Sequence, residues 1–142
     1  MNNITKKHED LKSFGLVVFG IVLNLVCSKI VGLLNLPFYF DCIGTIAAAI
    51  TGGFLPGVLV GFFTNFLSGI TDYTNLYYGV LNVLIALVAA FFSQKLYFKK
   101  ITWKIIIPII AFVLIGGGIG SVITWGLYGN TMGDELASSL AG

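Results

Sequence analysis

The chain has 142 residues, of which 57% are hydrophobic and only 10% are charged, and its net charge is +2. Soluble domains carry about 25% charged residues, so this chain has too little polar surface to cover a soluble core. The composition excludes a soluble enzyme, a secreted disulfide scaffold, a disordered segment and a nucleic-acid-binding module. It indicates a single all-α membrane domain that covers residues 1–142, because bilayer-spanning helices need about 20 apolar residues each.

Five apolar stretches predict a polytopic transmembrane helical bundle behind a polar tail at residues 1–13. The link from Gly52 to Pro56 is short, and proline suits the first turn of a helix, so the second and third helices are expected to form a tight antiparallel hairpin. The stretch 130–142 is too short and polar to span a bilayer. The expected spans are about 14–36, 42–55, 56–70, 76–98 and 103–128.

The few charges predict an orientation. All eight basic residues are lysines, and seven of them lie in two groups: Lys6, Lys7, Lys12, Lys95, Lys99, Lys100 and Lys104. Lysine-rich loops stay on the cytoplasmic side, which predicts a cytoplasmic N-terminus in a multi-pass plasma-membrane protein. Four acids then lie in the outer loops: Asp41, Asp72, Asp134 and Glu135. Five spans leave the C-terminus outside, so the chain is either a five-span form or a piece truncated before a further helix.

Lys29 and Asp41 are the charges that these groups do not explain. Ionisable residues at membrane depth are costly and are often functional, so a Lys29–Asp41 pair, or contact of either residue with a charged substrate group, is one hypothesis. In the alternative, Lys29 extends to the outer headgroups and Asp41 caps a helix N-terminus.

Amide, hydroxyl and aromatic side chains gather toward the predicted outer ends of the spans, and such a mixture suits a pocket for a small organic molecule. The alternative is an interfacial aromatic belt with interhelical hydrogen bonds. The candidate substrate-binding residues are Lys29, Asp41, Thr45, Asn65, Asn75, Asn82, Trp125 and Tyr128. With so few cations near them, a neutral or lightly charged ligand is favoured over a strongly anionic one.

Small residues also recur at four-residue spacing, which lets helix backbones approach closely. These pairs are Ser28/Gly32, Gly57/Gly61, Gly116/Gly120 and Gly129/Gly133.

Signatures of catalysis are missing from the sequence. It contains no H-E-x-x-H, G-x-S-x-G, Walker A or dinucleotide-binding pattern, and its one histidine lies in the charged N-terminal tail. We therefore expect no catalytic residues, no metal ligands and no cofactor. If transport is driven by ATP, another subunit must hydrolyse it.

One block resembles a known family. The run LPFYFDCIGTIAAAITGGFLPGVLVGFFTNFLSG at 36–69 is similar to the second and third helices of the substrate-binding S components of energy-coupling factor (ECF) transporters, riboflavin-transporter-like branch. The resemblance continues more loosely through Asn82 and the Trp125–Gly129 segment. It implies a bacterial plasma-membrane bundle that binds a vitamin-like molecule from outside. The implied partners are a membrane coupling subunit and a cytoplasmic ATPase pair, together with the lipid bilayer.

Two departures from that family leave alternatives open. The family has six spans, whereas the sixth is absent here, and the first span lacks the family's alanine-spaced docking motif. A second hypothesis is therefore a membrane-embedded sensory input domain of a bacterial signalling protein, truncated in this chain. A third is a five-helix structural or accessory membrane protein.

Overall fold

The computed structural model describes residues 3–34, 40–94 and 101–141. It is all-helical, with 92% of the described residues in helices, which confirms the expected all-α class. In chain order the elements are α1 (Asn3–Leu33), α2 (Ile43–Gly52), α3 (Phe54–Gly69), α4 (Thr74–Gln94), α5 (Ile101–Val113), a π-helical segment η1 (Leu114–Ile119) and α6 (Gly120–Ala141).

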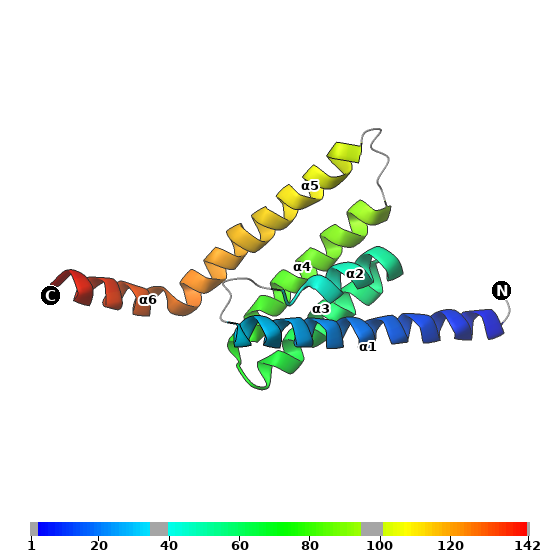
Figure 1. Ribbon diagram of the computed structural model, residues 1–142, viewed down its shortest axis with the longest axis horizontal. Coiled ribbons are helices and arrows are strands. Elements are labelled where there is room, and N and C mark those ends of the chain that lie inside the picture. The colour runs from blue at the N-terminus through cyan, green and yellow to red at the C-terminus, as the bar shows by residue number, and fades with distance from the viewer. Residues whose placement is uncertain (1–2, 35–39, 95–100, 142) are drawn as a thin grey trace.

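Helices α1 to α4 pack against one another, and we call them the four-helix body (Figure 1). Close contacts fix their directions. Gly57 approaches Ala49 and Gly61 approaches Thr45, so α2 and α3 are antiparallel, while the approach of Gly61 to Asn82 and of Gly69 to Leu76 makes α3 antiparallel to α4. The connections at 40–42 and 70–73 therefore lie at the same end of the body, which we call the acidic end because it carries Asp41 and Asp72.

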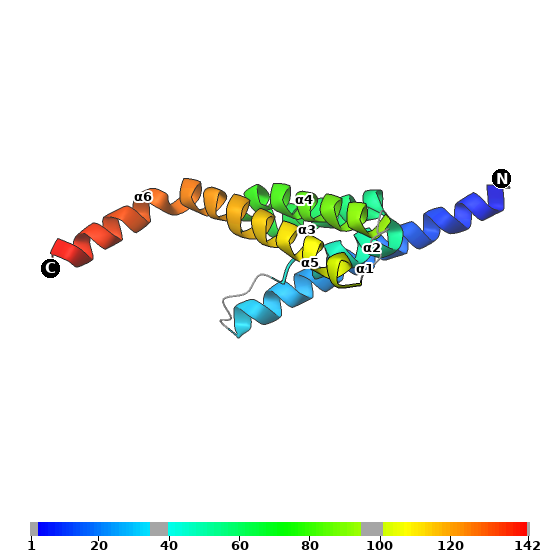
Figure 2. The same cartoon turned by 90° about the horizontal axis from the view of Figure 1, so that it is seen from above.

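Helix α5, η1 and α6 form one continuous helical path, which we call the C-terminal arm. The arm runs beside α4 and then bends, so that α6 leads away from the four-helix body (Figures 1 and 2). In both views the two ends of the chain lie at opposite extremes of the long axis. The helix continues past the predicted boundary at residue 128, and α1 likewise begins well before the predicted boundary at residue 14.

Three helical segments are long and apolar enough to cross a membrane: Lys6–Leu33, Thr74–Ser93 and Ile106–Gly129. They correspond to the first, fourth and fifth predicted spans. The prediction of five spans is not confirmed, because α2 has 10 residues and α3 has 16. At 1.5 Å per residue these helices measure about 15 and 24 Å, which is less than the roughly 30 Å of a bilayer's hydrocarbon core.

The α2–α3 hairpin turns on a single residue. Gly53 has φ 85°, a backbone conformation that residues with a Cβ rarely adopt, and it separates the end of α2 from the start of α3. Pro56 follows in the first turn of α3, where its missing N–H costs no hydrogen bond. The tight antiparallel hairpin predicted from this link is present.

Glycines let the helices of the body approach closely. A Cβ built on Gly44 would lie 2.1 Å from the carbonyl oxygen of Gly20, so these two residues bring α1 and α2 into backbone contact. The predicted Gly57/Gly61 pair also lies in contacts between helices. The Ser28/Gly32 pair does not, because Gly32 is exposed and a Cβ built on it would meet no other helix within 4 Å.

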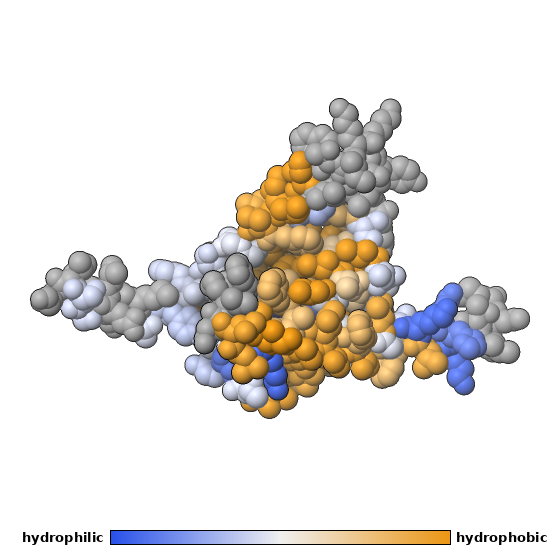
Figure 3. Space-filling view, in the orientation of Figure 1, coloured by the Kyte–Doolittle hydropathy of each residue, from blue (hydrophilic) through white to orange (hydrophobic). Residues whose placement is uncertain are grey.

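The surface of the body and of α5 is mostly apolar, while the charged start of α1 stands apart from it (Figure 3). Such a large apolar surface suits contact with lipid.

Two parts of the predicted pattern lie outside the described residues. They are the break at Pro37 and the lysines Lys95, Lys99 and Lys100.

Candidate functional site

The core of the four-helix body contains polar side chains from all four helices. We call them the polar layer, and each is at most 3% exposed: Asn24, Thr45, Thr64, Asn65 and Asn82. Burying an amide or hydroxyl is favourable only when its hydrogen bonds are made. The bonds of each member therefore indicate whether it stabilises the fold or is available to a ligand.

Both polar atoms of the Asn24 side chain, in α1, make hydrogen bonds to other helices of the body. Its Nδ2 donates hydrogen bonds to Thr45 Oγ1 at 2.9 Å and to Thr64 Oγ1 at 3.1 Å, and its Oδ1 accepts from the backbone N–H of Gly44 at 2.6 Å. One amide thus joins α1, α2 and α3. It also supplies a hydrogen bond to the first turn of α2, where backbone N–H groups have no partner within the helix.

This arrangement does not support the alternative in which Asp41 caps a helix N-terminus. Helix α2 is capped at Cys42, whose side chain makes no cap hydrogen bond, and the bond to its first turn comes from Asn24. The reason is tertiary, because the close approach of Gly20 and Gly44 brings Asn24 to the start of α2. Sequence spacing considers only neighbours along the chain and therefore offered Asp41 as a possible cap.

Asn82 of α4 is different, because half of its amide is unpaired. Its Nδ2 donates to the backbone carbonyl of Asp41 at 3.2 Å. Its Oδ1 is buried and has no hydrogen-bond partner within the described part of the chain. A buried polar atom without a partner costs about 1–3 kcal/mol, so this oxygen is the feature of the polar layer that the fold itself does not explain.

Asp41 lies beside Asn82, in the connection that precedes α2, and is half-buried. Burial raises the pKa of its carboxyl, and a hydrogen bond from its own backbone N–H partly opposes that shift. The predicted pair with Lys29 is not formed, since Lys29 is exposed on α1 and no ion pair joins the two side chains in the described ranges. The contact between Asp41 and Asn82 is therefore made by the backbone carbonyl of Asp41, and no cation pairs with its carboxyl in the described ranges.

Asn65 and Asn75 hold local structure. Asn65 Nδ2 donates to the carbonyl of Gly61 one turn earlier in α3 at 3.0 Å. Asn75 Nδ2 bridges the carbonyls of Ser68 and Asp72 at 3.4 and 3.2 Å, which ties the turn between α3 and α4 together. Asn65 also lines a small apolar cavity of about 230 Å³ between α3 and α4.

The two predicted site residues of α6 lie outside the polar layer. Trp125 is 76% exposed and Tyr128 is 40% exposed. The polar contact of α6 with α4 is made instead by Thr124, whose Oγ1 lies 2.8 Å from Tyr78 Oη. Trp125 and Tyr128 stay predictions, but they do not gather with the other candidates.

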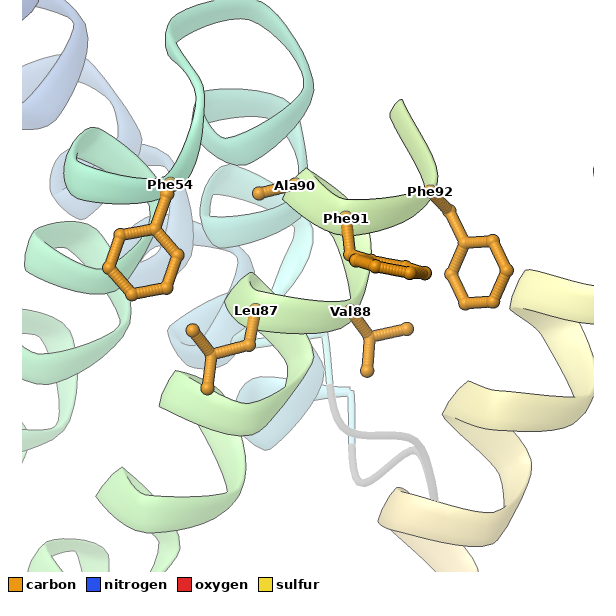
Figure 4. A pocket seen from close by; sticks show the side chains of 6 residues that line it. All are labelled: Phe54, Leu87, Val88, Ala90, Phe91 and Phe92. Carbon is orange, nitrogen blue, oxygen red and sulfur yellow. The ribbon is translucent and has the colours of Figure 1, made fainter. Parts of the chain in front are cut away.

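A groove larger than the cavity at Asn65 is lined by none of the candidate residues among those that the structure describes. It has a volume of about 440 Å³ and lies near the C-terminal end of α4, between α4 and the start of α3 (Figure 4). Its lining is apolar throughout: Phe54, Leu87, Val88, Ala90, Phe91 and Phe92. Ala90 is two turns, or about 12 Å, along α4 from Asn82, so the polar layer and this groove are separate features.

Sequence reasoning missed two members of the polar layer, Asn24 and Thr64. Asn24 had a visible signal, because it is an amide in the middle of an apolar span and buried amides there normally join helices. Thr64 had none, since a threonine is common in apolar helices.

Comparison of the chain with protein-family models, with curated proteins and with solved structures found no match.

Proposed function

We propose that this chain is a substrate-binding membrane subunit for the uptake of a vitamin-like small organic molecule, energised by separate ATPase subunits. The observation that carries the proposal is the buried, unpaired Oδ1 of Asn82 beside the half-buried Asp41. Proteins seldom leave such an acceptor unpaired without a functional reason. Both residues belong to the set that the sequence predicts for substrate binding.

The setting proposed for this site is a bacterial plasma membrane. The proposal includes a multi-pass bundle with a cytoplasmic N-terminus, so that the acidic end of the four-helix body faces outward. The apolar surface of the body and of α5 supports a lipid environment. The proposed partners are a membrane coupling subunit and a cytoplasmic ATPase pair, and they rest on the resemblance of residues 36–69 to the S components.

Equilibrium binding tests the proposal directly. The full chain, purified in detergent, is titrated with a panel of vitamins, and the same titrations are made with Asp41→Ala, Asn82→Ala and Trp125→Ala. We expect saturable binding of one compound and a loss of at least tenfold in affinity for the Asp41 and Asn82 variants. A loss in the Trp125 variant as well would place α6 at the ligand.

The matched control is Ser93→Ala. Ser93 Oγ donates to the carbonyl of Ile50 at 3.2 Å, so it links α4 to α2 near the C-terminal ends of both helices, about three turns along α4 from Asn82. This variant should bind the ligand like the unmodified chain. Absence of saturable binding to any compound, in protein whose helical content and unfolding transition are normal, would refute the proposal.

A further inference from the structure

The amide of Asn82 has one favoured orientation. Its Nδ2 donates to the carbonyl oxygen of Asp41 at 3.2 Å. If the amide were turned over, its oxygen would face that carbonyl oxygen, and two acceptors would meet. The neighbouring backbone therefore selects the orientation in which Oδ1 is the unpaired atom, and the unmet requirement at this point is a hydrogen-bond donor.

The surroundings of this oxygen supply acceptors. Asp41 contributes a carbonyl that Asn82 already uses and a carboxyl on the same residue. Thr45, whose methyl group flanks the contact between Gly61 and Asn82, accepts a hydrogen bond from Asn24, and its hydroxyl makes no bond to Asn82 Oδ1. Lys29 is exposed on α1 and forms no ion pair with Asp41. A group that completes the site must therefore bring a donor to Asn82 Oδ1, next to the backbone carbonyl oxygen of Asp41.

We propose that the ligand donates an N–H hydrogen bond to Asn82 Oδ1. The ligand is then an uncharged or cationic compound that presents an amide, imide or urea N–H, and not a carboxylate or phosphate. This inference rests on the proposed function, whose site it specifies. A site with a buried acceptor rejects analogues that lack the donor, because the acceptor is left unpaired in their complexes. An anionic group would in addition meet the acceptors of Asp41.

Access to this oxygen requires movement, because it is sealed from solvent. The adjacent part of the C-terminal arm is weakly attached. Helix α6 meets α4 through the hydroxyls of Tyr78 and Thr124, one turn along α4 from Asn82, and through Gly120, where an added Cβ would lie 3.8 Å from Leu81. Displacement of α6 at this contact would expose α4 around Tyr78, one turn from Asn82.

The experiment uses pairs of probes that differ by one donor. Lactams, cyclic ureas and cyclic imides are each tested beside their N-methyl analogues, with benzoate and phenyl phosphate as anionic probes. Binding to the full chain in detergent is screened by thermal shift and measured by calorimetry. We expect an N–H probe to bind at least tenfold more tightly than its N-methyl partner, in the unmodified chain and in Ser93→Ala.

Asn82→Leu assigns the effect to the proposed atom, because leucine has a similar size and no acceptor. We expect the N–H preference to fall to less than twofold in this variant. If the variant does not fold, the comparison of paired probes in the unmodified chain still decides the inference. Equal binding of N–H and N-methyl probes, or tighter binding of the anionic probes, overturns the inference and leaves the proposed function standing. Absence of binding by the probes and by the vitamin panel overturns both.

Discussion

The four-helix body and the C-terminal arm are both built from apolar helices, but they differ in how much they bury. Within the most apolar stretch of Thr74–Ser93, in the body, 33% is buried inside the protein, against 6% for Ile106–Gly129 in the arm. The body has glycine contacts and the polar layer. In the arm, a Cβ built on any of Gly116 to Gly118 would meet no other helix within 4 Å.

The difference shows that apolar composition alone does not bring these helices together. Lipid tails are as apolar as leucine, so helices in a bilayer associate through close backbone packing and interhelical hydrogen bonds. Gly20, Gly44 and Gly61 provide the first of these in the body, and Asn24 provides the second. The arm is joined to the body by the hydrogen bond between Tyr78 and Thr124.

The largest effect is expected at the closest backbone contact of the body. In Gly44→Ala the new methyl group would lie 2.1 Å from the carbonyl oxygen of Gly20, so α1 and α2 must separate. We expect the free energy of unfolding to fall by about 3 kcal/mol, measured by titration with a denaturing detergent. The control is Gly32→Ala, which meets no atom within 4 Å and should change stability by less than about 0.5 kcal/mol. Equal effects of the two variants would contradict this account of the packing.

Removal of the Asn24 amide should have the next largest effect. Asn24→Leu deletes three hydrogen bonds, and polar contacts between membrane helices average about 0.6 kcal/mol each. We therefore expect a loss of about 2 kcal/mol, measured in the same titration. Thr51→Val is the control, since the exposed Thr51 hydroxyl bonds only to Ala47 within α2. An Asn24 variant as stable as this control would show that the polar layer does not hold the body together.

The hydrogen bond between body and arm should contribute less to the stability of the protein. Thr124→Val removes the hydroxyl that lies 2.8 Å from Tyr78 Oη, and we expect a loss of about 0.6 kcal/mol. Hydrogen exchange should increase in α6 and stay unchanged in α2 and α3, because the arm can separate without opening the body. Thr131→Val, whose hydroxyl bonds to Tyr128 within α6, is the matched control. Faster exchange throughout the body would show that the two regions unfold as one unit.

The smallest effect concerns the turn between α3 and α4. The side-chain hydroxyl of Thr74, followed by its backbone N–H, lowers the pKa of Asp72 from its ordinary value of 3.8. A lowered pKa in the folded state stabilises the protein above pH 3.8, and this contribution is lost as pH falls through the lower folded value. NMR titration of the Asp72 carboxyl should give a pKa below 3.8, and Thr74→Val should raise it toward the ordinary value. An unchanged pKa in that variant would exclude Thr74 as the cause.

The sequence was sufficient to predict the helical class and the hairpin around Gly53. Three of the candidate residues chosen from it, Thr45, Asn65 and Asn82, lie in the polar layer. These features depend on apolar runs, turn residues and amides within apolar runs, all of which are local. The five-span count stays a prediction, because the apolar stretches around the two short helices continue through adjoining residues while the helices themselves are short. The capping of α2 by Asn24 and the isolation of Trp125 depend on which helices touch, and no local pattern contains that information.

The α2–α3 hairpin has a consequence for membrane sidedness. Its two helices are antiparallel, and the connections before and after it lie at the same end of the body. Whether both helices cross the bilayer or both turn back within it, they alter the number of crossings by an even number. Three crossings and five would therefore both leave the start of α1 on one side of the membrane and the part of α6 after Gly129 on the other. Sidedness depends on the parity of the crossings, and a reporter at each end of the chain can measure it without deciding how deep the hairpin reaches.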